Sequence, residues 1–247
     1  MPSRKRLITL GLAVFAIGVL LSFPARVAYH LFAPEQLKLS AISGTLWSGK
    51  AAEGQAASLY LQNLEWSFRP LALFTGKLAF DTRLDPAGGF LETQVALGFG
   101  GRVMFTDLDG AVPINALQGL LPAPGIGGNA RLTFSELTID NGLPVAADGT
   151  LDVQALSIRG LSPTPVGDFR AELSTTEDGI SGSVEDLAGM LDIAAALNIG
   201  SDRSVSLVGL VAPTPATPQT LTNQLRFLGS ANERGQREFR FEGEIPR

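Results

Sequence analysis

The sequence contains no cysteine and only one histidine among its 247 residues. Without cysteine, the chain cannot form a disulfide bond, a zinc–thiolate or iron–sulfur site, or a cysteine nucleophile. A metal site built from several imidazoles is also excluded, and a catalytic triad that needs histidine would have to use His30. These absences favour a protein that binds no metal.

Charged residues are scarce as well. They make up 17% of the chain, against ~25% in typical soluble domains, and the mean hydropathy is +0.21. The formal net charge is −5, from 19 Lys and Arg against 24 Asp and Glu. Arg4, Lys5 and Arg6 stand together at the start, so the rest of the chain has 16 basic and 24 acidic residues and a net charge of −8. Such a body repels phosphate and has no basic stripe, which argues against nucleic-acid binding.

Directly after the basic cluster, the 17 residues 7–23 carry no charge. This length lies at the lower end of the ~17–25 residues that a helix needs to cross a bilayer. We therefore expect a transmembrane anchor over residues 7–29, in which Arg26 reaches toward the polar zone and Tyr29 lies at the interface. The alternative is a cleaved signal peptide, but the apolar run is longer than usual and no small-x-small cleavage site follows it.

The positive-inside rule gives the expected orientation of this anchor. It places residues 1–6, a basic tip, in the cytoplasm and the rest of the chain across the membrane, which in a Gram-negative cell is the periplasm. Residues 30–36 are then a juxtamembrane linker, and residues 37–247 form a domain in the periplasm. The predicted location is the inner membrane, in a single-pass topology, with the lipid bilayer as a partner.

Beyond residue 36, the hydrophobic pattern has the period of strands rather than of helices. Apolar and polar side chains alternate, as over residues 78–84, and turn residues such as Asp140-Asn141-Gly142 and Asp148-Gly149 separate the runs. Two internal stretches, 114–121 and 219–228, each follow a proline and are expected as short helices. The predicted fold is therefore mainly β: one transmembrane helix, then an antiparallel sheet with one or two short helices.

One apolar pattern recurs in this β region: two alternating apolar residues, a gap of two residues, and two more apolar residues. Full copies occur at residues 59–66, 132–139 and 151–158, and a partial copy occurs at 103–108. In a straight strand the gap would send the later side chains to the opposite face, unless a β-bulge restores them. We expect bulged strands that coil the sheet into an open trough or a sandwich-like shape. The alternative is pairs of short strands joined by tight turns.

The search for catalytic motifs finds none. The sequence has no P-loop and no nucleophile elbow. Adjacent carboxylates, such as Glu177-Asp178 and Glu185-Asp186, fit solvated turns better than acid–base pairs. His30 lies beside the expected membrane exit and fits the interface better than a general base. The sequence thus predicts a protein that is not an enzyme and uses no cofactor.

Two segments near the start of the β region are more specific. Residues 41–51 read AISGTLWSGKA, and residues 64–78 read LEWSFRPLALFTGKL. Together with the short basic start and the single apolar run, they resemble the type II secretion system protein N family, whose members carry S-G-T-x-W-x-G and then W-x-x-x-P-x-x-L. Residues 166–169 and 239–243 also resemble that family, so the resemblance covers nearly the whole chain.

This resemblance implies an accessory component of the machine that exports folded proteins from the periplasm. Such a component is non-enzymatic, lies in the inner membrane and docks other type II secretion subunits through its β domain. A weaker, architectural similarity is to AsmA-like periplasmic proteins. It implies the alternative function, a lipid-handling module with an apolar β-groove.

Eight residues are candidates for contacts with a partner or with a lipid in a groove. The largest are Trp47 and Trp66; packing in the core is their simpler role, although aromatic side chains are also enriched at interfaces. Arg69 precedes Pro70, which is expected to end a strand because proline has no N–H to donate. The full set is Trp47, Trp66, Phe68, Arg69, Leu132, Phe134, Leu151 and Val153, of which the last four would line the groove.

Overall fold

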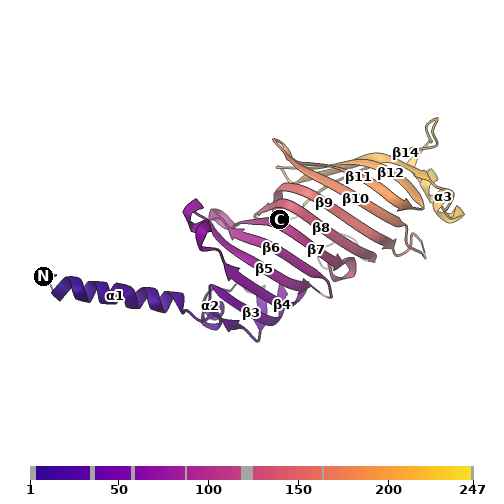
Figure 1. Ribbon diagram of the computed structural model, residues 1–247. Coiled ribbons are helices and arrows are strands. Elements are labelled where there is room, and N and C mark those ends of the chain that lie inside the picture. Colours follow the sequence, from indigo (N-terminus) through magenta and orange to yellow (C-terminus); the bar gives the residue numbers. More distant parts are fainter. Residues whose placement is uncertain are drawn as a thin grey trace.

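The structure of the protein is a computed structural model that describes residues 4–33, 37–56, 59–86, 88–117, 125–162 and 164–245. Figure 1 shows one long sheet whose strands lie side by side in the order of the chain, with α1 projecting from one end and α3 at the other. All pairings in this sheet are antiparallel. The prediction of a mainly β protein with an antiparallel sheet is confirmed.

Over the described residues the sheet has 14 strands, in the order β1-β3-β4 and onward to β14, with β2 paired beside β3. The strands are β1 Leu37–Ser40, β2 Ser43–Gly44, β3 Ser48–Ala56, β4 Leu59–Phe68, β5 Leu78–Pro86, β6 Phe90–Leu97, β7 Arg102–Pro113, β8 Ile126–Asp140, β9 Leu143–Ile158, β10 Gly167–Thr176, β11 Gly179–Gly189, β12 Leu191–Gly200, β13 Ser204–Pro213 and β14 Arg237–Glu244. The helices are α1 Arg4–Leu21, α2 Ala25–Phe32 and α3 Gln219–Leu225, and the 3-10 turns are η1 Pro70–Thr75, η2 Phe99–Gly101, η3 Ile114–Leu117 and η4 Arg226–Leu228.

The N-terminal apolar stretch forms two helices, so the anchor expected over residues 7–29 is not one continuous helix. α1 ends at Leu21 and α2 begins at Ala25. Pro24 separates them because its ring has no N–H for a helical hydrogen bond and disfavours a helical conformation at Phe23. In the part of the chain that the structure describes, no helix combines the length and the apolar character that a membrane crossing needs.

β-bulges occur at all four copies of the recurrent apolar pattern. On β4, β7 and β9 the bulged residues Asn63, Asp107 and Ala155 have φ angles of 49°, 50° and 50°. On β8 the register shifts between Phe134 and Glu136. Each extra residue returns the later apolar side chains to the face of the earlier ones. One core cluster therefore contains residues from both sides of the β7 and β8 bulges, namely Phe105, Leu108, Phe134 and Leu137. The prediction of bulged strands is confirmed.

The segment Gly167-Asp168-Phe169 supports the bulge on β9. The N–H group of Ala155 donates a hydrogen bond to Oδ1 of Asp168 at 2.7 Å. Phe169 is buried in the core near α3, and Gly167 lies opposite Gly189 in the ladder. The aspartate thus supplies the acceptor that a bulge in the ladder takes away from the backbone.

One expected turn lies inside a strand instead. Asp148 and Gly149 belong to β9 and do not link two strands. A Cβ atom on Gly149 would lie 2.6 Å from Cα of Phe134, so this glycine allows the close approach of β8. The turn expected at Asp140-Asn141-Gly142 is confirmed as the link between β8 and β9.

Three short elements cover parts of the apolar face of the sheet. α2 covers it near β3, η3 covers it near β8, and α3 covers it near β13. The residues that these elements bury there are Ala25 of α2, Ile114 of η3, and Leu221 and Leu225 of α3. The short helix expected at 219–228 is confirmed as α3 followed by η4, and that at 114–121 begins as η3; residues 118–124 lie outside the described residues.

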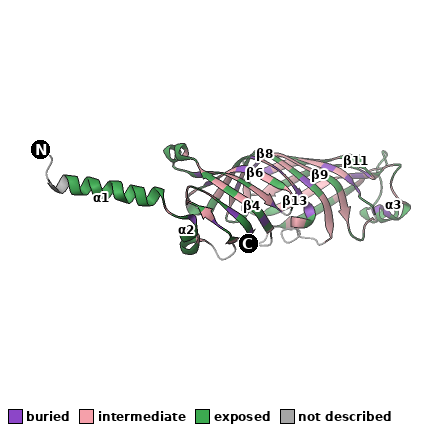
Figure 2. Ribbon diagram, turned by 60° about the horizontal axis from the view of Figure 1, so that its bottom comes forward, coloured by how far each residue is buried: buried purple, intermediate pink, exposed green. Residues whose placement is uncertain are grey.

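The sheet curls about its long axis, as Figure 2 shows. Arg203, in the link between β12 and β13, donates from Nη2 to the carbonyl oxygen of Asn141 in the link between β8 and β9 at 3.3 Å, although β10 and β11 lie between these links in the sheet. Nε of Arg203 also donates to the carbonyl oxygen of Ile245 at 3.2 Å. The shape is therefore the trough of a single curled sheet rather than two stacked sheets.

Candidate functional site at the helix–sheet junction

The residues S-G-T-L-W-S-G form a tight turn between β2 and β3. Gly44 and Gly49 lie opposite each other in the ladder, and the N–H of Thr45 donates to the carbonyl oxygen of Ser48 at 2.8 Å. Gly44 has a φ angle of 93°, and a Cβ atom there would lie 2.5 Å from the oxygen of Ser48. This position therefore requires glycine, for its backbone conformation and for space.

The turn holds Trp47 against the end of α1. Nε1 of Trp47 donates to the carbonyl oxygen of Leu20 at 2.8 Å, and the N–H of Leu46 donates to the oxygen of Phe23 at 2.9 Å. The carbonyl oxygen of Leu20 also accepts from the N–H of Phe23 at 3.3 Å, so the indole adds a second, shorter hydrogen bond at the end of the helix. The indole also packs on the ring of Phe68, with the centroids 4.8 Å apart. Trp47 thus links the end of α1 to the sheet.

Trp66 fills the space between α2 and the sheet. Its ring packs against a cluster that contains Ala25 of α2 and Ala51 of β3. Nε1 donates to the carbonyl oxygen of Leu46 at 3.2 Å. A Cβ atom on Gly49 would lie 2.5 Å from Cζ2 of Trp66, so the indole lies directly on that glycine. Trp66 thus packs between α2 and the sheet, and it also lines the hollow described below.

Polar side chains of α2 complete the junction. Nε of Arg26 donates to the carbonyl oxygen of Ile42 at 2.5 Å. The hydroxyl of Tyr29 donates to the oxygen of Leu37 and accepts from the N–H of Leu39, both at 3.0 Å. The two side chains expected at the membrane interface therefore hold α2 to the first strands.

Phe68 and Arg69 lie beside this junction. The ring of Phe68 packs between those of Trp47 and Phe80, at centroid distances of 4.8 and 5.5 Å. The guanidinium of Arg69 lies 3.5 Å from the carboxylate of Asp81. β4 ends at Phe68, directly before Arg69 and Pro70, which confirms the expected strand end.

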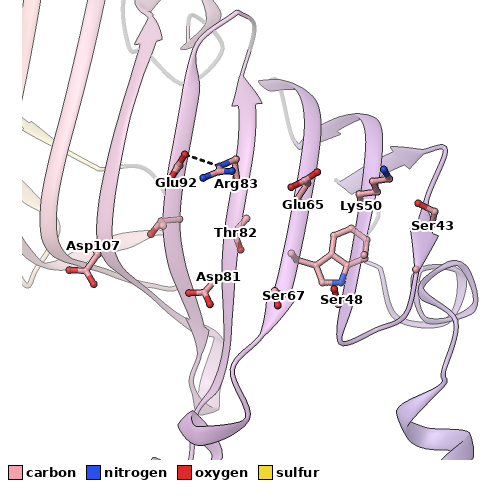
Figure 3. A pocket seen from close by; sticks show the side chains of 14 residues that line it. Ser43, Ser48, Lys50, Glu65, Ser67, Asp81, Thr82, Arg83, Glu92 and Asp107 are labelled. Carbon is pink, nitrogen blue, oxygen red and sulfur yellow. Dashed lines mark hydrogen bonds and ion pairs between the residues drawn. The ribbon is translucent and has the colours of Figure 1, made fainter.

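A hollow of about 630 Å³ lies next to the junction, over β2 to β7, and Figure 3 shows it. Its charged lining residues are Lys50, Glu65, Asp81, Arg83, Glu92 and Asp107. Nε of Arg83 forms an ion pair with Oε1 of Glu92 at 2.7 Å. Four of these six side chains are acidic, which gives the lining a formal charge of −2, and Arg69 beside Asp81 offsets part of it. The hollow is therefore weakly acidic and suits a partner segment that carries positive charge.

The hollow is one end of a row of charges that crosses nine strands, from β3 to β11. Each residue of the row lies opposite the next one in the strand register, except Asp109 and Arg131, which form a diagonal ion pair. In order across the sheet, the row is Lys50, Glu65, Arg83, Glu92, Asp109, Arg131, Asp152, Arg170 and Glu185. Arg170 and Asp152 form two hydrogen bonds, of 2.6 and 3.1 Å, and the bond from Arg170 lowers the pKa of Asp152. Opposite charges alternate along the row except at Glu92 and Asp109, two carboxylates that face each other; the opposite pairs stabilise the pairing, and the charges keep this face in water.

The sequence alone does not reveal this charge row. Each member occupies an ordinary polar position of its strand, and only the register places it beside an opposite charge.

The four groove candidates form a second group, on β8 and β9. Phe134 is 5% exposed within a core cluster, and Leu132 and Leu151 pack against it. Val153 packs against the cluster around Ile114 of η3. None of the four lines the hollow at the junction. Among the described residues, no group of three His, Asp or Glu side chains could hold a metal ion.

Comparison with known proteins points to one family. The family profile "Type II secretion system (T2SS), protein N" matches residues 35–240. Relatives named "Type II secretion system protein N" from Aeromonas hydrophila and Vibrio cholerae serotype O1 are each 25% identical, over 99% and 98% of this chain and 100% of theirs. One from Pectobacterium carotovorum subsp. carotovorum is 21% identical over 99% of this chain and 100% of its own. No solved structure matches.

The profile match contains both the turn at Trp47 and the segment from Trp66 to Pro70, on which the resemblance depended, and it extends over most of the chain. The chain therefore belongs to the type II secretion system protein N family.

Proposed function

We propose that the protein is a non-enzymatic accessory component of the type II secretion system, anchored in the inner membrane, which docks other subunits through a periplasmic β domain. Family membership supports the role in secretion. The observation that carries the anchoring is α1, whose large apolar side chains are exposed on all sides, as at Ile8, Val14 and Leu20 with 69%, 62% and 54%. A helix that is apolar all round requires an apolar surrounding, and a bilayer supplies it.

The proposed topology keeps residues 1–6 in the cytoplasm and the β domain, residues 37–247, in the periplasm. The uncharged part of α1, residues 7–21, is about 22 Å long at 1.5 Å per residue, against ~30 Å of hydrocarbon. Residues 22 and 23 and a local thinning of the bilayer make up the difference. α2 is packed on the sheet, so we place it outside the bilayer, with the linker over residues 30–36.

We place the docking surface at the acidic hollow beside Trp47. Its position next to α1 puts it near the membrane, where the other membrane subunits of a secretion machine are within reach. A photo-crosslinking amino acid at Glu65 should capture another secretion subunit in intact cells, whereas the same amino acid at the exposed Asn223 of α3 should not. Repeated failure to capture any subunit, together with normal export in a deletion strain, would refute the proposal.

The lipid-handling alternative needs an open apolar channel along Leu132, Phe134, Leu151 and Val153. Phe134 is 5% exposed, and η3 packs against the cluster that Val153 contacts. Leu132, Leu151 and Val153 are partly buried. The contacts of Phe134 favour a packed core at this place. Extraction of the protein with stoichiometric bound phospholipid would favour the alternative instead.

A further inference from the structure

The link between β4 and β5 exposes three large apolar side chains. In η1, Leu71, Leu73 and Phe74 are 77%, 52% and 88% exposed, and none of the described residues of η1 is buried. Single exposed apolar residues are common on protein surfaces. Here, three exposed apolar side chains lie within four positions of one short link and form an apolar surface patch. Such patches often mark a contact surface.

η1 lies at the edge of the sheet where α1 ends. Phe68, the last residue of β4, packs on the ring of Trp47, and Trp47 donates to the carbonyl oxygen of Leu20 near the end of α1. In Figure 1 the violet coil of η1 is on the side of the sheet from which α1 projects, and Figure 2 shows the same arrangement. A bilayer that holds α1 would therefore pass close to η1.

The link between β6 and β7 at the same edge, residues 98–101, is uncharged, and the links after it are polar. They are Asn141-Gly142 between β8 and β9, Glu177-Asp178 between β10 and β11, and Ser201-Asp202-Arg203 between β12 and β13. The two links nearest α1 carry no acidic side chain, and the acidic links lie farther along the sheet. This order fits a nearby anionic surface, which acidic side chains avoid.

Two exposed basic residues, Arg69 and Lys77, flank η1. Exposed Leu and Phe between basic residues are the features of segments that lie in the interface of an anionic bilayer. We propose that η1 inserts into the periplasmic leaflet of the membrane, with Leu71, Leu73 and Phe74 at the acyl boundary and Lys77 at lipid phosphates, while Arg69 stays beside Asp81. This inference rests on the proposed anchoring of α1. A second contact with the membrane fixes the tilt and rotation of the β domain, which a single helix leaves free.

The lack of cysteine makes a direct test simple, because a single introduced cysteine can carry an environment-sensitive NBD probe. The full-length Phe74→Cys variant, reconstituted in vesicles of phosphatidylethanolamine and phosphatidylglycerol, should show a blue shift and an emission rise of about twofold or more as the probe leaves water. Lipids that carry a quencher near the headgroup should reduce this emission. The matched control is Phe227→Cys, since Phe227 is 91% exposed at the far end of the sheet and its probe should report water.

A third variant, Val14→Cys in α1, separates this inference from the proposed anchoring. If the probe at residue 14 reports lipid and the probe at residue 74 behaves like that at 227, the inference is overturned and the anchoring stands. If the probes at 14 and 74 both report water, the anchoring fails as well. Adding Lys77→Glu to Phe74→Cys should reduce the emission rise in these vesicles but not in vesicles of phosphatidylcholine, and an equal rise with and without Lys77→Glu would overturn the role given to the lipid phosphates.

Discussion

Replacing Gly49 by alanine tests whether the turn at the helix–sheet junction needs the indole of Trp66 to lie directly on the backbone of Gly49, where a side chain would not fit. The added Cβ atom would lie 2.5 Å from Cζ2 of Trp66 and 2.5 Å from the carbonyl oxygen of Ser43, whereas ordinary contacts begin at 3.4 Å. Both neighbours must therefore retreat by about 0.9 Å. The indole packs against α2, and the oxygen of Ser43 belongs to the ladder between β2 and β3. Moving either group therefore costs packing or hydrogen-bond energy.

Overpacking of this kind costs ~1–3 kcal/mol, and the involvement of backbone places Gly49→Ala in the upper part of that range, at about 2–3 kcal/mol. For a chain of this size each kcal/mol lowers Tm by ~2–4 °C, so we expect a fall of about 4–12 °C. The control is Gly98→Ala, where the added atom would lie 3.5 Å from the oxygen and 3.6 Å from Cβ of Arg102. That contact is ordinary, and the stability should change by less than ~0.5 kcal/mol.

The assay is thermal unfolding of the full-length variants in detergent, followed by circular dichroism and by tryptophan emission. Gly49→Ala should lower Tm and shift the emission to longer wavelength, because the indole of Trp66 becomes more exposed to water. The same Tm and emission for Gly49→Ala and Gly98→Ala would refute the packing argument for this turn.

Three further predictions concern other parts of the fold. Trp47→Phe removes the indole donor to the carbonyl oxygen of Leu20 and should lower the stability by ~0.5–1.5 kcal/mol. It should also broaden the distribution of distances between spin labels on α1 and β3, measured by double electron–electron resonance. An unchanged distribution would contradict the role of Trp47 in holding α1 to the sheet. Asp168→Ala leaves the N–H of Ala155 without its acceptor and should cost ~1–2 kcal/mol, whereas Asp168→Asn keeps an oxygen there, and equal losses in chemical denaturation would argue against the bond. The hydrogen bond from Arg170 lowers the pKa of Asp152 in the folded state. Its contribution to the free energy of unfolding is therefore complete above about pH 5 and is lost as the pH falls below ~4. The wild type should lose stability more steeply with acid than Asp152→Asn, and parallel plots of stability against pH for the two proteins would exclude this contribution.

The bulges could be predicted from the sequence because they follow from local geometry. Successive side chains of a strand alternate between faces, so a gap of two between apolar residues needs an extra residue. The gap residues Asn63 and Asp107 also suit the positive φ that such positions adopt. The end of β4 before Pro70 is predictable for the same kind of reason, since proline carries no N–H for the ladder.

Other features depend on residues that are distant in the sequence. Asp148-Gly149 has the letters of a turn, yet Gly149 lies within β9 because Phe134 of the neighbouring strand needs its space. The charge row depends on register, which joins Asp152 to Arg170 across 18 positions. The indole of Trp47 bonds the end of α1 across 27 positions. None of these partners can be found from the period of one strand.

By itself, the sequence determined the class of the fold, the bulges, the strand end at Pro70 and the family resemblance, because these depend on side-chain period, proline chemistry and short motifs. Only the tertiary structure decided that the two tryptophans form the joint between the helices and the sheet, that the charges align across nine strands, and that the apolar link η1 lies beside α1. The physical reason is that these features are contacts between separate strands and helices, and the register and the curl of the sheet decide which side chains meet.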